Sequence, residues 1–225
     1  MNFYCVTCAS SRYIVPAQKL LFRKYLNIEP TYIDVDDTPL KQWGPTVASM
    51  LPDDEFIVFG LDDFLPIGHI DWDGFNKAAG IVANQVERFE LGWGASVGKS
   101  GLQETNGWLR YTQTTSYKVS TQFSIWRTTA LARELERTTT PWDFEIRGRC
   151  TAGCFNKEDA VFRFIDSSAI SGRRPGKLNL CGLRQEDEDE LVRLGLVDKS
   201  KVIYGWLGDE RRTKEAYGDR YAEFF

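Results

Sequence analysis

Short apolar runs alternate with helix-like segments over the first 62 residues. Each run ends in polar or turn-forming residues, as buried strands do. In the first helix, Pro16 suits the first turn and Leu20, Leu21 and Tyr25 are spaced towards one side. The expected elements are strands at 2–8, 31–36 and 56–61 and helices at 16–27 and 40–51. Strand, helix, strand, helix, strand is the order of a parallel α/β sheet.

The pattern after residue 71 is less regular. The expected elements are a helix at 72–90, a mobile loop rich in Gly, Ser and Thr at 92–106, antiparallel strands at 108–111 and 117–119, and helices at 120–137, 156–164 and 188–196. No stretch resembles a linker that would separate two domains. We therefore expect one domain over residues 1–225, an α/β fold with a mixed, mostly parallel, Rossmann-like sheet flanked by helices.

Composition agrees with a packed domain and adds an uneven distribution of charge. The chain has 225 residues, 42% of them hydrophobic and 13% aromatic, and a net charge of −4. That average combines a net −10 over residues 29–73 with a net +6 over residues 99–184. The net charge disfavours a uniformly cationic nucleic-acid coat but does not exclude a local basic patch.

Membrane and secretion signals are missing from the sequence pattern. No apolar run approaches the ~20 residues that a membrane-spanning helix needs. The first residues carry neither a basic segment nor a small-residue cleavage site, so we see no secretory signal. The expected location is the cytoplasm, or the host cytoplasm if the protein is viral.

The five cysteines are compatible with two chemical roles, a redox pair or a zinc site, and with a purely structural role. Cys5 and Cys8 have the C-x-x-C spacing of a redox pair, or of half a zinc site completed by Cys150 and Cys154. The fifth is Cys181. An odd count without a secretion signal disfavours a disulfide framework. The alternative is that these thiols are reduced and partly buried.

The single histidine restricts the possible chemistry. His69 is the only candidate for a catalytic triad, a Cys-His dyad or a histidine metal site. A metal in this protein is therefore expected on oxygen ligands, which favour Mg²⁺ or Mn²⁺.

An acidic pair follows the most hydrophobic predicted strand. Asp62 and Asp63 come directly after residues 56–61, and adjacent carboxylates repel each other. A divalent cation would relieve that repulsion and could bridge the carboxylates to a diphosphate. The structural alternative is a turn-forming or helix-capping pair.

An ordered set of motifs resembles the GT-A class of nucleotide-sugar-dependent glycosyltransferases, in particular its small bacterial and viral members. The set spans roughly residues 3–180 and comprises Cys8-Ala9-Ser10-Ser11-Arg12-Tyr13, Phe59-Gly60-Leu61-Asp62-Asp63-Phe64, the segment from Tyr117 to Arg127, and Pro141-Trp142-Asp143-Phe144-Glu145. The class signature is Asp-any-Asp, whereas here the two aspartates are contiguous. The resemblance implies a GT-A-like fold in which residues 1–98 bind the donor and metal and residues 99–225 bind the acceptor.

The resemblance also implies a donor, a cofactor and residues that bind them. The donor is a nucleotide-diphosphate sugar, expected to be a UDP-sugar, and the cofactor is Mn²⁺ or Mg²⁺. Asp63 is the expected metal ligand, with Asp62 on the metal, ribose or sugar. The residues expected near the nucleotide are Thr7, Ser10, Arg12, Asp34 and Asp36. Apart from the resemblance, the glycine-flanked basic loop with Arg173 and Lys177 could close over the diphosphate, or it could be a solvated loop.

A general base is also expected, because an acceptor hydroxyl must lose its proton as the sugar–phosphate bond breaks. Glu145 is the first choice, since a carboxylate held between the rings of Trp142 and Phe144 could be partly desolvated, and Asp143 is its substitute. The alternative is that Glu145 only pairs with Arg127 or Arg147. Residues expected to contact the acceptor are Gln122, Trp126 and Trp142, although Trp126 has the spacing of a core residue.

Other functions remain open at this stage. The acceptor could be a glycan or a modified base of viral DNA. A nucleotidyltransferase would also use paired carboxylates and a cation, although its Gly-rich, Lys-containing loop is not evident. A non-catalytic nucleotide- or carbohydrate-binding module would bind the donor without turning it over.

Overall fold

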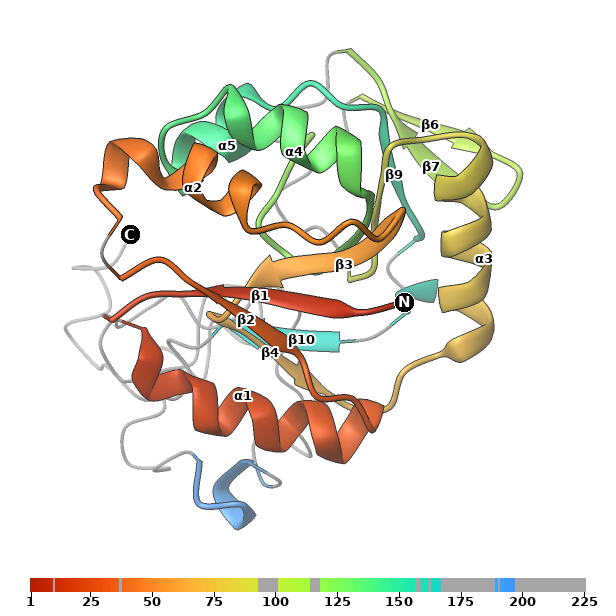
Figure 1. The fold of residues 1–225 in the computed structure, drawn as a ribbon. Coiled ribbons are helices and arrows are strands. Elements are labelled where there is room, and N and C mark those ends of the chain that lie inside the picture. The colour runs from red at the N-terminus through yellow and green to blue at the C-terminus, as the bar shows by residue number, and fades with distance from the viewer. Residues whose placement is uncertain are drawn as a thin grey trace, which may run out of the picture.

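A computed structural model gives the fold of the chain (Figure 1). The residues that it describes are 1–9, 11–36, 38–92, 101–113, 118–156, 159–161, 163–166, 189 and 191–196.

An eight-stranded sheet forms the centre of the molecule, in the order β2-β1-β3-β8-β5-β9-β7-β6. Its strands are β1 (Phe3–Thr7), β2 (Thr31–Asp34), β3 (Phe56–Leu61), β5 (Arg88–Glu90), β6 (Leu102–Thr105), β7 (Trp108–Tyr111), β8 (Ser124–Arg127) and β9 (Ala152–Cys154). The pairings make β7 and β8 run opposite to the other six. The chain therefore has the predicted mixed, mostly parallel α/β fold of Rossmann-like type.

Helices cover both faces of this sheet (Figure 1). The helices are α1 (Val15–Leu21, continued by a π-helical turn over Phe22–Leu26), α2 (Trp43–Ser49), α3 (Trp72–Asn84), α4 (Thr128–Glu136) and α5 (Pro141–Arg147). In Figure 1, α2, α4 and α5 lie above the sheet, whereas α1 lies below it with a separate antiparallel pair, β4 (Phe64–Ile67) and β10 (Arg163–Asp166). Strands from both predicted halves of the chain join the one large sheet.

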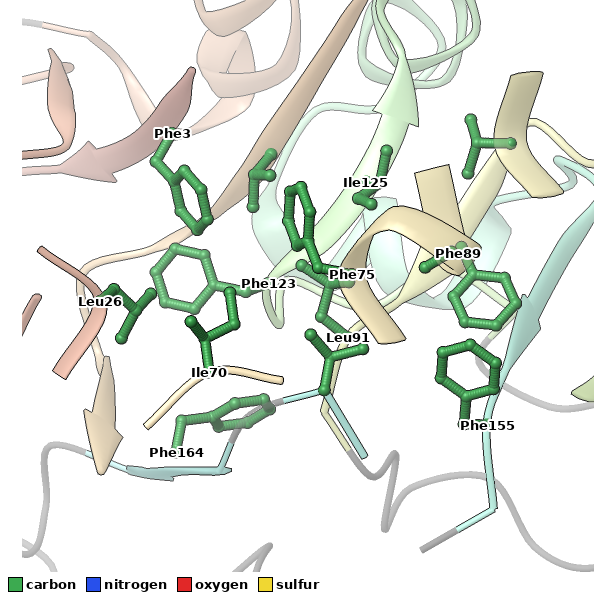
Figure 2. Packing of buried hydrophobic residues seen from close by; sticks show 14 of the residues in the cluster. Phe3, Leu26, Ile70, Phe75, Phe89, Leu91, Phe123, Ile125, Phe155 and Phe164 are labelled. Atoms are coloured by element: carbon green, nitrogen blue, oxygen red, sulfur yellow. The ribbon is translucent and has the colours of Figure 1, made fainter. Parts of the chain in front are cut away.

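Aromatic side chains dominate the core on the α1 and α3 side (Figure 2). Phe3 of β1 packs edge-on to Phe22 at 5.8 Å and stacks on Phe75 of α3 at 6.1 Å between ring centroids. Phe123 lies 5.2 Å from Phe22 and fills the space beside Gly60 of β3, where a Cβ atom would lie 2.6 Å from the ring. Glycine at this position lets a phenyl ring pack against the strand that leads to Asp62.

Two predicted helices are partly wrong. Residues 120–137 form the strand β8 and then α4, and residues 72–90 form α3 and then the strand β5. In both cases the helical spacing is real over the helix but continues by coincidence into a buried strand. Ser124, Ile125 and Trp126 of β8 are all fully buried, so the strand shows no alternation of polar and apolar residues.

The loop predicted at 92–106 contains a strand at its end. Residues 93–100 lie outside the described residues, but β6 pairs with β7 through a tight turn at Asn106 and Gly107, both with positive φ (49° and 80°). Asn-Gly is the usual sequence of such a hairpin turn, so the sequence does contain a signal for this hairpin. Lys118 and Val119 are not in a strand, and residues 163–166 form β10 rather than the end of a helix.

The helices of the described segments are short. The longest, α3, has 13 residues, and none has the length and apolarity needed to cross a bilayer.

Candidate functional site

The candidate site lies at the sheet edge where β1, β2 and β3 end. The chain passes from β1 through α1 to β2 on one side, and then through α2 to β3 on the other side of β1. Because the two connections leave in opposite directions, the carboxyl ends of β1 and β3 flank a topological switch point, where α/β sheets bind ligands. Thr7 ends β1 and Asp62 follows β3 at this point.

Asp62 is held at the switch point by β1 and by the loop after it. Its backbone N–H donates to the carbonyl of Val6 at 3.1 Å, and its Oδ2 accepts a 2.5 Å hydrogen bond from the Ser11 hydroxyl. Cys8 N in turn donates to Ser11 Oγ at 3.3 Å. Ser11 was not predicted as a site residue, although it belongs to the Ser10-Ser11 pair from which Ser10 was chosen, and Ser10 lies outside the described residues.

The carboxylate of Asp62 is buried without a compensating cation among the described side chains. The residue is 4% exposed, and none of the described lysines and arginines forms an ion pair with it. Burial raises the pKa of Asp62, an effect that the hydrogen bond from the Ser11 hydroxyl opposes. A positive ligand would remove the electrostatic penalty of keeping this group ionised.

Three of the five residues predicted around the nucleotide form a second cluster at the end of β2, the strand next to β1. Arg12 Nη2 contacts Asp34 Oδ2 at 2.5 Å and also contacts Asp36 Oδ2. Asp36 N donates to Asp34 Oδ1 at 3.0 Å, so the end of β2 is folded around the guanidinium. The Arg12 and Asp34 side chains are half-exposed and that of Asp36 is 24% exposed, and two carboxylates already neutralise the charge of Arg12.

Glu145 reaches the same edge of the sheet from α5. Helix α5 starts at Pro141 and turns Phe144 into the core, where its ring lies 5.9 Å from that of Trp43. Glu145 Oε1 accepts hydrogen bonds from Thr121 N at 2.8 Å and from Thr121 Oγ1 at 2.7 Å. Thr121 O accepts from Leu61 N at 3.0 Å. A single residue, Thr121, therefore links Glu145 to the residue before Asp62, and the partner of Glu145 is neither Arg127 nor Arg147.

Asp143, the substitute for Glu145, is engaged within its own helix. Its Oδ2 accepts from Thr139 N at 3.0 Å, and its Oδ1 contacts Arg147 Nε at 2.6 Å. These contacts stabilise the start and the end of α5. The structure therefore links Glu145, and not Asp143, to the end of β3.

The three predicted acceptor residues have different surroundings. Trp126 lies on β8 and is fully buried, so it fills the core and the prediction that it contacts an acceptor is wrong. Trp142 is 62% exposed on α5, while Gln122 is 3% exposed beside Thr121. Arg173 and Lys177 of the predicted basic loop lie outside the described residues.

A buried ion pair supports the segment that carries Thr121. Arg88 of β5 contacts Glu90 Oε2 at 3.0 Å, and both side chains are completely buried. Arg88 also donates to Ser120 Oγ at 2.7 Å and to the Lys118 carbonyl at 3.0 Å, and Tyr111 donates to Glu90 Oε2 at 3.0 Å. Because Arg88 and Glu90 were predicted at the end of a helix, this network was not foreseen.

The cysteines do not form the zinc site that their spacing allowed. Cys5 packs into the core on one face of the sheet, whereas Cys150 and Cys154 pack into the core on the other. Burial raises the pKa of the Cys150 and Cys154 thiols to about 12, so neither is a nucleophile near neutral pH. Cys181 lies outside the described residues.

Asp62 and Asp63 are the donors that suit a hard divalent cation. Both offer carboxylate oxygens, and the buried charge of Asp62 favours a cation beside it. Throughout the part of the chain that the structure describes, no cluster of three or more His, Cys, Asp or Glu side chains could hold a metal ion. A cation on this pair would therefore need further oxygen ligands from a diphosphate or from water.

Comparisons with known proteins add little to this geometry. Neither a family model nor a curated protein sequence matches the chain. One solved structure, "Crystal Structure of A197 from STIV", is similar over 74% of this chain and 85% of that chain, with 12% identity and a TM-score of 0.46. A likeness at that level says nothing about activity.

Proposed function

We propose that this protein is a metal-dependent glycosyltransferase of GT-A type, which transfers a sugar from a nucleotide-diphosphate sugar to an acceptor hydroxyl. One observation carries the proposal: Asp62 and Asp63 stand at the switch point of the sheet, and Thr121 ties the carboxylate of Glu145 to the same strand end. A metal-binding acidic pair and a basic carboxylate on one edge are what sugar transfer from a diphosphate requires.

The donor would bind across the ends of β1, β2 and β3. Asp63 and Asp62 would hold Mn²⁺ or Mg²⁺, which stabilises negative charge on the departing diphosphate. Ser11 fixes the rotation of the Asp62 carboxylate through its 2.5 Å hydrogen bond. The half-exposed carboxylate of Asp34 and the more buried carboxylate of Asp36 would accept hydrogen bonds from the nucleoside, while Arg12 holds both in place.

Glu145 would remove the proton from the acceptor hydroxyl. Thr121 occupies its Oε1, so Oε2 is the oxygen available to take that proton. The acceptor oxygen then bonds to the anomeric carbon while the sugar–phosphate bond breaks and the diphosphate leaves with the electron pair. A base on the side opposite the leaving group produces inversion at the anomeric carbon.

The acceptor is a glycan or a modified base of viral DNA. The net +6 over residues 99–184 is compatible with a polyanion. Binding to DNA would weaken steeply as salt increases, because counterions are released from the phosphates. If the protein does not bind DNA at low salt, a DNA base is ruled out as the acceptor and a glycan remains.

The decisive experiment compares Asp63→Asn with Asp53→Asn. Asp53 belongs to another Asp-Asp pair, in an exposed turn before β3, so its variant is a matched control for loss of one carboxylate. We expect Asp63→Asn to abolish Mn²⁺-dependent turnover of UDP-sugars and to weaken UDP binding, and Asp53→Asn to change neither. A screen of sugar nucleotides by thermal shift, with and without Mn²⁺, should precede a donor-hydrolysis assay.

Several outcomes would contradict the proposal. Unchanged turnover in Asp63→Asn would remove the metal assignment. Release of pyrophosphate from a nucleoside triphosphate, without sugar transfer, would indicate a nucleotidyltransferase. Binding of the donor without any turnover would indicate a binding module.

A further inference from the structure

We infer that Thr121 is a positioning residue that orients the Glu145 carboxylate for proton transfer. The inference rests on the proposed function, since it concerns the same site. It concerns a residue that was expected inside the helix at 120–137 and that instead lies in the segment before β8. Thr121 would not touch the substrate and would act only through Glu145.

Two donors of Thr121 converge on one oxygen of Glu145. The backbone N–H lies 2.8 Å and the hydroxyl 2.7 Å from Oε1. Within the described part of the chain, no donor reaches Oε2. The terminal torsion of a glutamate is broad and poorly restrained by itself, so a carboxylate on an unsupported side chain would rotate. Two hydrogen bonds from one rigid residue restrict that rotation and direct Oε2 away from Thr121.

Thr121 is itself fixed by the sheet and by the buried ion pair. Its carbonyl accepts from Leu61 N at 3.0 Å, and the residue is 6% exposed. The preceding residue, Ser120, is held by Arg88 at 2.7 Å. Functional groups are held accurately when their supporting residues are locked by packing and hydrogen bonds. Thr121 meets that condition, because β3 holds it on one side and β5 holds its neighbour on the other.

Thr121 also fixes the position of Glu145 relative to the end of β3, which carries Asp62 and Asp63. The Thr121 carbonyl binds Leu61, while its N–H and hydroxyl bind Glu145. A movement of the end of β3 would therefore move Glu145 with it. Reacting groups must be held close to their productive arrangement, and a displacement of about 1 Å costs roughly a hundredfold in rate.

The test uses Thr121→Val and Thr121→Ser. Valine keeps the branched shape and the backbone N–H but removes the hydroxyl donor, whereas serine keeps the donor. We expect Thr121→Val to lower kcat for sugar transfer by about ten- to a hundredfold with KM for the UDP-sugar unchanged. Thr121→Ser should restore most of that loss. In a Glu145→Gln background, Thr121→Val should have little further effect, because the residue acts only through the carboxylate.

Thr138→Val is the matched control. Thr138 is also a buried threonine, with its hydroxyl donating to the Leu135 carbonyl at 3.0 Å, and it lies at the end of α4. This variant should lower thermal stability while leaving kcat unchanged. It would show that losing a buried threonine hydroxyl does not by itself lower kcat. Thr121→Ala provides a second variant without the hydroxyl if Thr121→Val does not fold.

The outcomes separate this inference from the proposed function. If the wild-type protein turns over no nucleotide sugar, the proposed function fails and the inference fails with it. If the wild type is active and Thr121→Val retains its kcat, only the inference is overturned. An equal loss from Thr121→Val in the wild-type and Glu145→Gln backgrounds would also overturn it.

Discussion

Replacing Arg88 with methionine should be among the most destabilising single substitutions in this protein. Arg88 is completely buried, contacts Glu90 Oε2 at 3.0 Å and lies 5.6 Å above the Trp126 ring. Methionine keeps a flexible apolar side chain of similar length beside Trp126 but removes the charge and all donors. Glu90 would then remain buried as an anion with the Tyr111 hydroxyl as its described donor.

The size of the effect follows from what remains after the substitution. Removing one member of a buried ion pair costs about 3–5 kcal/mol, chiefly because the remaining charge is unpaired. The Ser120 hydroxyl and the Lys118 carbonyl also lose their partner, and each such loss adds about 1 kcal/mol. We therefore expect Arg88→Met to lower the free energy of unfolding by roughly 5–7 kcal/mol.

A second substitution separates the charge from the packing. Arg88→Met combined with Glu90→Gln removes both charges, while the amide oxygen that replaces the carboxylate could still accept from Tyr111. If the unpaired carboxylate is the main cost, the double variant should be about 1–3 kcal/mol more stable than Arg88→Met alone.

Urea unfolding followed by circular dichroism at neutral pH would measure these differences. The slope m should be checked in each variant, because a changed slope indicates an altered unfolded or native state. A loss below about 1 kcal/mol for Arg88→Met would refute the reasoning, since buried charges left unpaired cost more than this. A double variant less stable than Arg88→Met would refute it as well.

Two further predictions concern the end of β3. Burial raises the pKa of Asp62 in the folded state, so its ionised form weakens the fold at neutral pH, and this penalty disappears as pH falls through the raised pKa. Asp62→Asn should thus have a higher urea midpoint of unfolding than the wild type at pH 7, and the difference between the two midpoints should become smaller as the pH is lowered. A difference in midpoint that does not change with pH would contradict this. Gly60→Ala places a Cβ 2.6 Å from the Phe123 ring and should cost about 1–3 kcal/mol in urea unfolding. The control Gly80→Ala, in an exposed turn of α3 with nothing within 4 Å, should be neutral or stabilising; equal effects would contradict the steric argument.

The N-terminal half of the fold was predictable because its strands obey local rules. β3 runs over Phe56–Leu61 as expected, and α1 begins one residue before Pro16. The apolar runs there are bounded by turn residues, so local pattern and tertiary structure agree. The acidic pair could also be placed, because parallel strands end at one edge of a sheet.

The rest depended on contacts between distant residues. β5 contains Arg88 and Glu90, which are rare inside a strand buried on both faces, and their mutual pairing with hydrogen bonds from distant residues accommodates them there. The link from Glu145 to Thr121 spans 24 residues, and no local pattern signals it. Trp126 had helical spacing to Phe123, yet β8 inserts it into the core between β3 and β5.

The insertion of β8 between β3 and β5 has a consequence for synthesis of the chain. The edge of β3 that faces away from β1 has no partner until residues 124–127 emerge from the ribosome. At about 5–20 residues per second, the 66 residues between Leu61 and Arg127 take roughly 3–13 s to make. During that interval Ile57, Val58 and Phe59 present a bare apolar edge. A nascent chain paused before residue 124 should therefore depend on chaperones, and released chains truncated there should aggregate.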